Sequence, residues 1–263
     1  MKTAVRIISM PEATARRIEF TRAAEPSQVP WEFFDAARTC EAPLDYDERR
    51  AIRRFGRPLR PGELGCYSSH FQLWQWLLQS SYDQLIVFED DVTIDWNVVA
   101  ILAANDMEAI GIGVLRLFTT HPFRFEVARY KFLSDHSHLL RLKGHAYGTP
   151  GYLITRQGAT ALVACGMRVD APVDWVISRY WEHGVAQYCL LPAPLFEKHG
   201  TSTIGHGQGE EFIETLSNRV FRQCWNGIER LRRWKADRFI KSPVDFIDPA
   251  DCGAAYIKSS SAP

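Results

Sequence analysis

A run of four apolar residues that ends in three consecutive carboxylates is the feature that most constrains how this chain folds. The segment DQLIVFEDDVTIDW covers residues 83–96, and its LIVF run is followed directly by Glu89, Asp90 and Asp91. A short apolar run of this kind is typical of a strand buried on both faces. Because side chains alternate across a strand, Glu89 and Asp91 are expected to face one way and Asp90 the other.

Strands and helices alternate along the chain up to about residue 210. We expect strands at residues 4–9, 29–35, 84–88, 113–118, 138–144 and 184–192, and a strand followed by a helix at 151–166. A helix is expected after Pro11, and another over residues 61–81, where Leu64, Tyr67, Phe71, Trp74 and Leu78 recur at spacings of three and four. This alternation predicts an α/β domain with a layered sheet over residues 1–210.

The three carboxylates are candidate ligands of a divalent metal ion. Like charges crowded at the end of a buried strand repel one another, and a cation relieves that repulsion. Carboxylate oxygens suit Mg²⁺ or Mn²⁺, and open α/β sheets bind ligands at the carboxyl ends of their strands. The alternative is an acidic turn in contact with solvent.

Several ordered blocks of the sequence resemble glycosyltransferase family 25. LRPGELGCYSSHFQLWQWLLQSSYDQLIVFEDDVTI resembles the signature block of that family, which includes bacterial enzymes that add β-galactose to lipopolysaccharide and the collagen galactosyltransferases of animals. IISMPEATARRIEF, EFFDA, GTPGYLITRQGATAL and APVDWVI resemble further blocks, so the resemblance runs from about residue 3 to about residue 205. It implies a fold of the GT-A type, in which helices flank a single nucleotide-binding sheet.

The resemblance implies roles for the carboxylates. It makes Glu89, Asp90 and Asp91 a variant of the Asp-x-Asp motif, in which Asp91 binds Mn²⁺ or Mg²⁺ beside the diphosphate of a UDP-sugar. Glu89 would reach the ribose or a metal-bound water, and Asp90 is grouped with the nucleotide-binding residues. His199, in the late segment, is a second candidate metal ligand.

Further candidates for substrate binding come from the other matching blocks. They are Ile8, Ser9, Arg17 (with Arg16 as its alternative), Asp35, His70, Arg116, Gly144, Thr149 and Tyr152. The alternatives are a solvated arginine for Arg17, a cap for Asp35, a satisfied core group for His70 and an edge-exposed charge for Arg116.

A transfer that inverts the sugar needs a base to accept the proton of the acceptor hydroxyl. Asp174 in APVDW is the candidate base, and a helix N-cap is the alternative role for this residue.

The last part of the chain, residues 211–263, is predicted to be a basic helical extension. Residues 214–241 carry eight basic and three acidic side chains. Phe212, Leu216, Val220, Cys224, Ile228 and Leu231 keep helical spacing along one face. Peripheral contact with an anionic membrane is one interpretation, and packing on the domain with a solvated basic face is another. Nucleic acid is the least favoured partner, since Lys plus Arg and Asp plus Glu both number 31.

These observations together favour a metal-dependent inverting glycosyltransferase that moves galactose from UDP-galactose onto lipopolysaccharide or another glycan. Three alternatives stay open: a catalytically degenerate relative that binds nucleotide sugars, a transferase of another UDP-sugar onto a protein, and a nucleotidyltransferase or phosphohydrolase. No signal-peptide pattern is seen at the start, and the six cysteines include no CxxC pair. We therefore expect a cytoplasmic protein, with a peripheral position on the inner face of the bacterial inner membrane as a further option.

Overall fold

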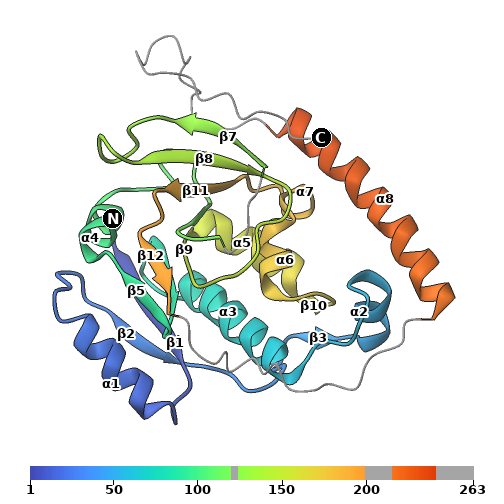
Figure 1. The fold of residues 1–263 in the computed structure, drawn as a ribbon, viewed down its shortest axis with the longest axis horizontal. Coiled ribbons are helices and arrows are strands. Elements are labelled where there is room, and N and C mark those ends of the chain that lie inside the picture. The colour runs from blue at the N-terminus through green and yellow to red at the C-terminus, as the bar shows by residue number, and fades with distance from the viewer. Residues whose placement is uncertain (120–123, 199–214, 241–263) are drawn as a thin grey trace.

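An eight-stranded sheet forms the centre of the protein in a computed structural model that describes residues 1–119, 124–198 and 215–240 (Figure 1). Its strands are β1 (Thr3–Ser9), β2 (Glu32–Asp35), β4 (Gln84–Glu89), β6 (Val114–Arg116), β7 (Arg124–Arg129), β8 (His138–Lys143), β9 (Gly151–Thr155) and β11 (Gln187–Leu191). They lie in the order β2-β1-β4-β9-β6-β11-β8-β7. Two small sheets pair β3 (Asp45–Tyr46) with β10 (Arg168–Val169) and β5 (Val92–Ile94) with β12 (Leu195–Glu197).

Helices cover both faces of the sheet. One face packs against α1 (Thr14–Ala23) and α4 (Trp96–Ala104), and the other against α3 (Pro61–Gln79), α5 (Arg156–Gly166) and α6 (Val173–Ser178). The short helices α2 (Glu48–Arg54) and α7 (Tyr180–His183) and the long helix α8 (Leu216–Phe239) complete the fold.

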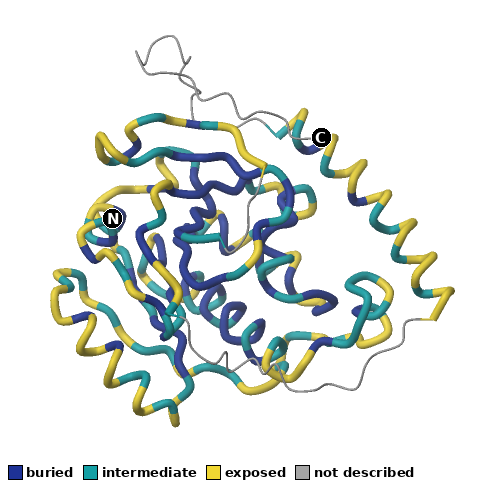
Figure 2. The backbone as a smooth tube through the Cα atoms, viewed as in Figure 1, coloured by how far each residue is buried: buried dark blue, intermediate teal, exposed yellow. Residues whose placement is uncertain are grey.

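The two faces follow from alternation along the strands. In β1, Val5 and Ile7 belong to the core that includes Phe20 of α1, whereas Ala4 and Ile8 belong to the core that includes Phe71 of α3. Figure 2 shows the inner strands of the sheet as deeply buried, whereas the edge strands β2 and β7 are partly exposed. The predicted α/β class, with one sheet between helices, is confirmed, and the arrangement agrees with a GT-A type.

The strand register brings the ends of several strands to one edge. β2, β1 and β4 are parallel, with Ser9 beside Asp35 and Ile8 beside Glu89. β9 runs antiparallel to β4, so that its beginning borders the same edge, and the backbone N–H of Glu89 donates to Pro150 O at 3.0 Å. Polar residues at these strand ends therefore lie near one another although they are far apart in the sequence.

The predicted strands and helices are largely confirmed. Tyr67, Phe71 and Trp74 of α3 are fully buried, as the spacing within residues 61–81 predicts. The structure adds α4 and the edge strand β7, which the sequence patterns did not predict. Within the described ranges, no helix combines the length and the apolar character needed to cross a membrane.

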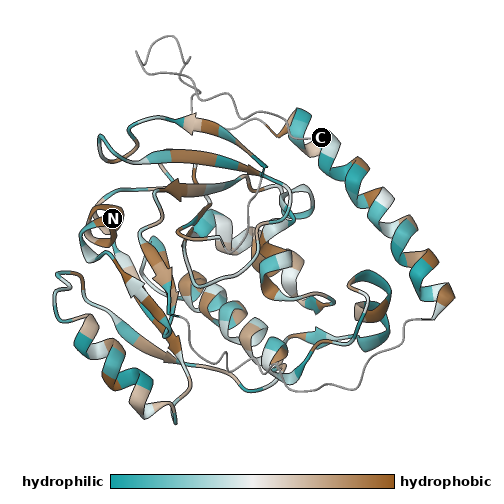
Figure 3. Ribbon diagram, in the orientation of Figure 1, coloured by the Kyte–Doolittle hydropathy of each residue, from teal (hydrophilic) through white to brown (hydrophobic). Residues whose placement is uncertain are grey.

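The C-terminal helix α8 packs on the domain through its polar side rather than its apolar side. It contacts α2 and α7, where Trp225 lies under the Arg54 guanidinium and Glu229 pairs with Arg179 at 3.1 Å. Figure 2 shows α8 as mostly exposed along its length, and Figure 3 shows hydrophobic and hydrophilic residues mixed along it. The helix itself is confirmed from Leu216 onward, and Phe212 lies outside the described residues. The domain boundary at residue 210 stays a prediction.

Candidate functional site

A cavity of about 480 Å³ lies where the ends of β1 and β4 meet α1 and α3. Of the residues singled out in the sequence, it is lined by Ile8, Ser9, Arg16, His70, Glu89, Asp90 and Asp91. Segments separated by more than 80 positions in the sequence thus contribute to one site, because three parallel strands end at the same edge of the sheet.

All three carboxylates border this cavity. As the alternation predicts, Asp90 faces away from Glu89: the Glu89 carboxylate lies toward His70 of α3, whereas Asp90 lies toward α1. That Asp91 faces the same way as Glu89 stays a prediction, since β4 ends at Glu89. Asp90 is almost fully buried, accepts a hydrogen bond from Ser9 Oγ at 2.6 Å and pairs with Arg16 Nη1 at 3.0 Å. Its charge is therefore compensated within the protein.

The charge of Asp91 is compensated less well than that of Asp90. Burial raises its pKa to about 6, and the neighbouring carboxylates of Glu89 and Asp90 add to that rise. Carboxylate oxygens suit a hard divalent ion such as Mn²⁺ or Mg²⁺. The backbone N–H of Lys198 donates to Asp91 O at 2.8 Å, while His199 itself lies outside the described residues.

Arg16 and Arg17 of α1 make different contacts. Arg17 Nη2 donates to Asp35 Oδ1 at 2.5 Å and to Ser9 O at 2.8 Å, and its guanidinium stacks on Phe33. Asp35 is thus an ion-pair partner at the end of β2. Arg16, the alternative to Arg17, is the arginine that lines the cavity.

A chain of buried hydrogen bonds holds His70 toward the carboxylates. Trp74 Nε1 donates to Tyr152 Oη at 2.9 Å, and that hydroxyl lies 2.9 Å from His70 Nδ1. Burial raises the pKa of Tyr152, so that the hydroxyl keeps its proton and can donate it to Nδ1. His70 Nε2 then carries a hydrogen and points toward Glu89 Oε1 at 3.8 Å, and Thr149 Oγ1 donates to the same oxygen at 3.1 Å.

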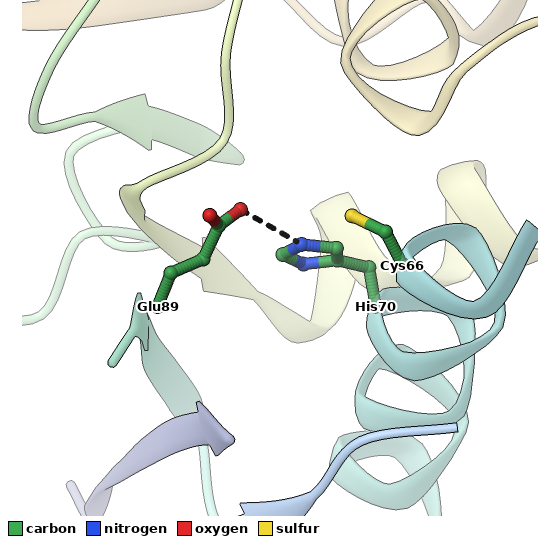
Figure 4. Close-up of side chains that lie close together, drawn as sticks. All are labelled: Cys66, His70 and Glu89. Carbon is green, nitrogen blue, oxygen red and sulfur yellow. Dashed lines mark ion pairs between the residues drawn. The ribbon is translucent and has the colours of Figure 1, made fainter. Parts of the chain in front are cut away.

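Cys66 joins this group, and the sequence analysis did not single it out. Figure 4 shows Cys66 and His70 on α3 facing Glu89, and one ligand atom from each of the three lies within 4.8 Å of the others. The signal was the spacing of four between Cys66 and His70, which places both on one helix face. Burial and the carboxylates of Glu89 and Asp174 raise the pKa of the thiol. Because metal binding needs the thiolate, the raised pKa of Cys66 opposes metal binding by this set.

Arg116 and Asp174 form a second part of the site. Arg116 is buried, so it is no edge-exposed charge, and it donates through Nη1 to Gly148 O at 2.5 Å and through Nη2 to Asp174 O at 3.1 Å. The Asp174 carboxylate accepts from the backbone N–H groups of Gly148 at 3.0 Å and Trp175 at 2.9 Å. Burial raises the pKa of Asp174. The N-cap of α6 is Pro172, so the alternative role of Asp174 as an N-cap is wrong.

Gly144 lies away from the first cavity. It has a φ of +98°, which favours glycine, and it lines a second cavity of about 540 Å³ together with Lys143, Tyr147 and Arg233. The loop from Gly144 to Thr149 therefore begins at the second cavity and ends at the Glu89 carboxylate.

Comparison with known proteins identifies the family. Residues 2–177 match the model described as glycosyltransferase family 25 (LPS biosynthesis protein). The lipooligosaccharide biosynthesis protein lic2B of Haemophilus influenzae is 27% identical over 60% of this chain and 61% of that protein. Human procollagen galactosyltransferase 2 is 26% identical over 68% of this chain and 31% of that protein. A glycosyltransferase 25 family member of Aedes aegypti is 31% identical over 62% of this chain and 29% of that protein.

The extent of these matches differs between bacterial and animal relatives. The chain matches about three fifths of the Haemophilus protein and less than a third of either animal protein. The family model, in contrast, covers more than half of this chain, including β1, the carboxylates and Asp174. The resemblance drawn from the sequence is confirmed: the chain belongs to glycosyltransferase family 25.

Proposed function

We propose that this chain is a metal-dependent inverting galactosyltransferase that moves galactose from UDP-galactose onto lipopolysaccharide or another glycan. The observation that carries the proposal is the gathering of Glu89, Asp90 and Asp91 in one cavity, with the pKa of Asp91 raised to about 6. Carboxylates crowded in this way fit a cation that in turn binds a diphosphate.

On the donor side, the proposal assigns the nucleotide to the end of β1 and the start of α1. Asp90 is already paired with Arg16 and Ser9, which leaves Asp91 and Glu89 to face the metal. A divalent ion bound there would neutralise charge on the departing UDP. Arg17 and Asp35 support this edge through the stack on Phe33.

On the acceptor side, Asp174 is proposed as the base. As the acceptor oxygen bonds to the sugar carbon and the bond to UDP breaks, the hydroxyl proton passes to the Asp174 carboxylate. A raised pKa makes this carboxylate a better proton acceptor than an ordinary aspartate. Two backbone N–H groups and the nearby Arg116 hold Asp174 in place. Adjacent residues of one loop contact both carboxylates, because the Gly148 N–H donates to Asp174 and Thr149 Oγ1 donates to Glu89, which lines the cavity.

The names of relatives support the choice of sugar and acceptor. One relative is named as a lipooligosaccharide biosynthesis protein and another as a procollagen galactosyltransferase. Galactose is the sugar in the name of the procollagen enzyme, and a lipopolysaccharide-type acceptor agrees with the name of the bacterial protein. The cytoplasmic location of this chain stays a prediction.

The test compares Asp91→Asn and Asp174→Asn with Asp135→Asn, a control of the same charge change on a well-exposed side chain. Calorimetry with UDP-galactose and other UDP-sugars, with and without Mn²⁺, measures binding, and UDP release with a truncated lipopolysaccharide measures transfer. We expect Asp91→Asn to lose Mn²⁺-dependent binding. Asp174→Asn should bind normally but transfer about 10²- to 10⁴-fold more slowly.

Other outcomes separate the rival functions. Binding of UDP-sugars with no transfer to lipopolysaccharide or protein acceptors would favour a degenerate relative. Release of phosphate or pyrophosphate in place of UDP would identify a phosphohydrolase or nucleotidyltransferase. Full transfer by Asp91→Asn would refute the metal role.

A further inference from the structure

Helix α8 presents an apolar face that the rest of the described chain does not cover. Leu216, Val220, Ile228, Leu231 and Trp234 are each between 45% and 75% exposed, and we call these five residues the outer face. At 3.6 residues per turn they lie on one side of the helix, because they recur at spacings of four, eight, three and three. The 24 residues of α8 form a rod of about 36 Å. Its apolar surface is therefore long and continuous.

Polar contacts hold the opposite side of α8 to the domain. The Glu229 carboxylate pairs with Arg179 Nε at 3.1 Å, and Asp237 accepts from Tyr180 Oη at 2.5 Å. Ala236 is also buried on this side. The outer face is thus not needed to attach the helix, which leaves its apolar residues unexplained by the fold.

The charges of α8 are divided between its two sides. Within Leu216–Phe239 there are seven basic and two acidic residues, and both acidic residues, Glu229 and Asp237, face the domain. Arg230, Lys235 and Arg238 lie on or beside the outer face by helical spacing, whereas Arg222, Arg232 and Arg233 contact the domain. The outward half of α8 therefore combines an apolar stripe with positive charge.

We propose that the outer face of α8 binds the surface of an anionic lipid bilayer, with the helix lying in the plane of the membrane. A helix with a strong apolar face, little overall hydrophobicity and Lys or Arg along its flanks partitions into the headgroup region of a bilayer. Each cation near an anionic surface strengthens that partitioning about fivefold. Trp234 belongs to the outer face, and indole side chains favour the interface between lipid and water.

Two other occupants fit less well. If two copies of the chain paired through their outer faces, the flanking cations of both helices would come close together, and these charges repel. A nucleic acid would use the cations but would leave Leu216, Val220 and Leu231 exposed to water. The membrane accounts for both the apolar and the charged residues. This inference goes beyond the proposed transfer reaction and does not depend on it.

Vesicle co-sedimentation of the full chain tests the proposal. We expect binding to vesicles that contain phosphatidylglycerol, weaker binding at high salt, and much weaker binding to phosphatidylcholine alone. Removing two flanking cations in Arg230→Gln/Lys235→Gln should weaken binding about 30-fold. The control Arg22→Gln/Arg49→Gln removes the same charge from exposed positions on α1 and α2 and should bind like wild type.

A second pair of substitutions tests the apolar part. Ile228→Ser/Leu231→Ser should lose vesicle binding while UDP-sugar binding and the melting temperature stay near wild type, which shows that the fold is intact. Equal binding by these variants and wild type would overturn the proposal. A dimer in wild type that these substitutions dissolve, without any vesicle binding, would assign the face to a second copy. Vesicle binding by a chain that binds no UDP-sugar would leave this inference standing while the proposed function failed.

Discussion

Replacing Asp91 by asparagine should make the metal-free protein more stable at neutral pH. The Asp91 carboxylate is partly buried beside Glu89 and Asp90, and its pKa rises from an ordinary value of 3.8 to about 6. The folded protein therefore holds this proton more tightly than the unfolded chain does. Protonated Asp91 stabilises the fold below about pH 4, and this contribution is lost as the pH rises toward about 6. Asparagine removes the charge at every pH.

The size of the expected gain in stability follows from the pKa shift of Asp91. A rise from 3.8 to about 6 corresponds to roughly 3 kcal/mol at neutral pH. Because solvent reaches part of the side chain, we expect about half of this, or about 1.5 kcal/mol. For a chain of this size the melting temperature should rise by about 3 to 6 °C.

Thermal unfolding in EDTA from pH 4 to pH 8 measures this directly. Wild type should lose stability between pH 4 and pH 6 relative to Asp91→Asn, and the two should converge at pH 4. Mn²⁺ should then stabilise wild type at pH 7.5 and leave Asp91→Asn unchanged, since an ion that binds only the folded state raises its stability. Asp135→Asn serves as the control and should follow wild type. The reasoning is refuted if Asp91→Asn is less stable than wild type in EDTA at pH 7.5.

Two further substitutions test the packing of the domain and of α8 by chemical denaturation. Gly158→Ala should cost about 1 to 3 kcal/mol or more, because the added carbon would lie 2.1 Å from Gly113 O, whereas Gly227→Ala meets nothing within 4 Å and should be neutral or stabilising by up to about 1 kcal/mol. Glu229→Gln should cost about 1 to 3 kcal/mol, because it removes one partner of a buried ion pair with Arg179, and α8 should show faster amide hydrogen exchange. Equal stability of Gly158→Ala and Gly227→Ala, or unchanged exchange in α8, would contradict these expectations.

The sequence predicted best the elements whose apolar residues keep a clear period. α3 has five apolar residues at spacings of three and four, and β4 is a short apolar run, so both were identified. α4 was missed because its nine residues are apolar on nearly every side and show no period. β7 was missed because an edge strand in contact with solvent needs few apolar residues.

The candidate site was predictable only in part. The resemblance selected Glu89, Asp91 and Ser9, and the strand register then explains why they meet. Alternation along the strand predicted that Asp90 faces away from Glu89, and Asp90 contacts Arg16 of α1 while Glu89 lies toward His70 of α3. The pairing of Arg16 with Asp90 depends on how α1 packs against the sheet, which no local pattern encodes.

The antiparallel direction of β9 has a consequence for how relatives could diversify. Because this strand enters the sheet at the edge where β1 and β4 leave it, the segment from Gly144 to Pro150 connects two cavities without interrupting the sheet. Under the proposed function, insertions or exchanges in that segment would change which acceptor binds and leave β1 and β4, where the nucleotide is proposed to bind, unchanged. Sequence changes confined to this one short segment would then alter acceptor specificity independently of donor specificity.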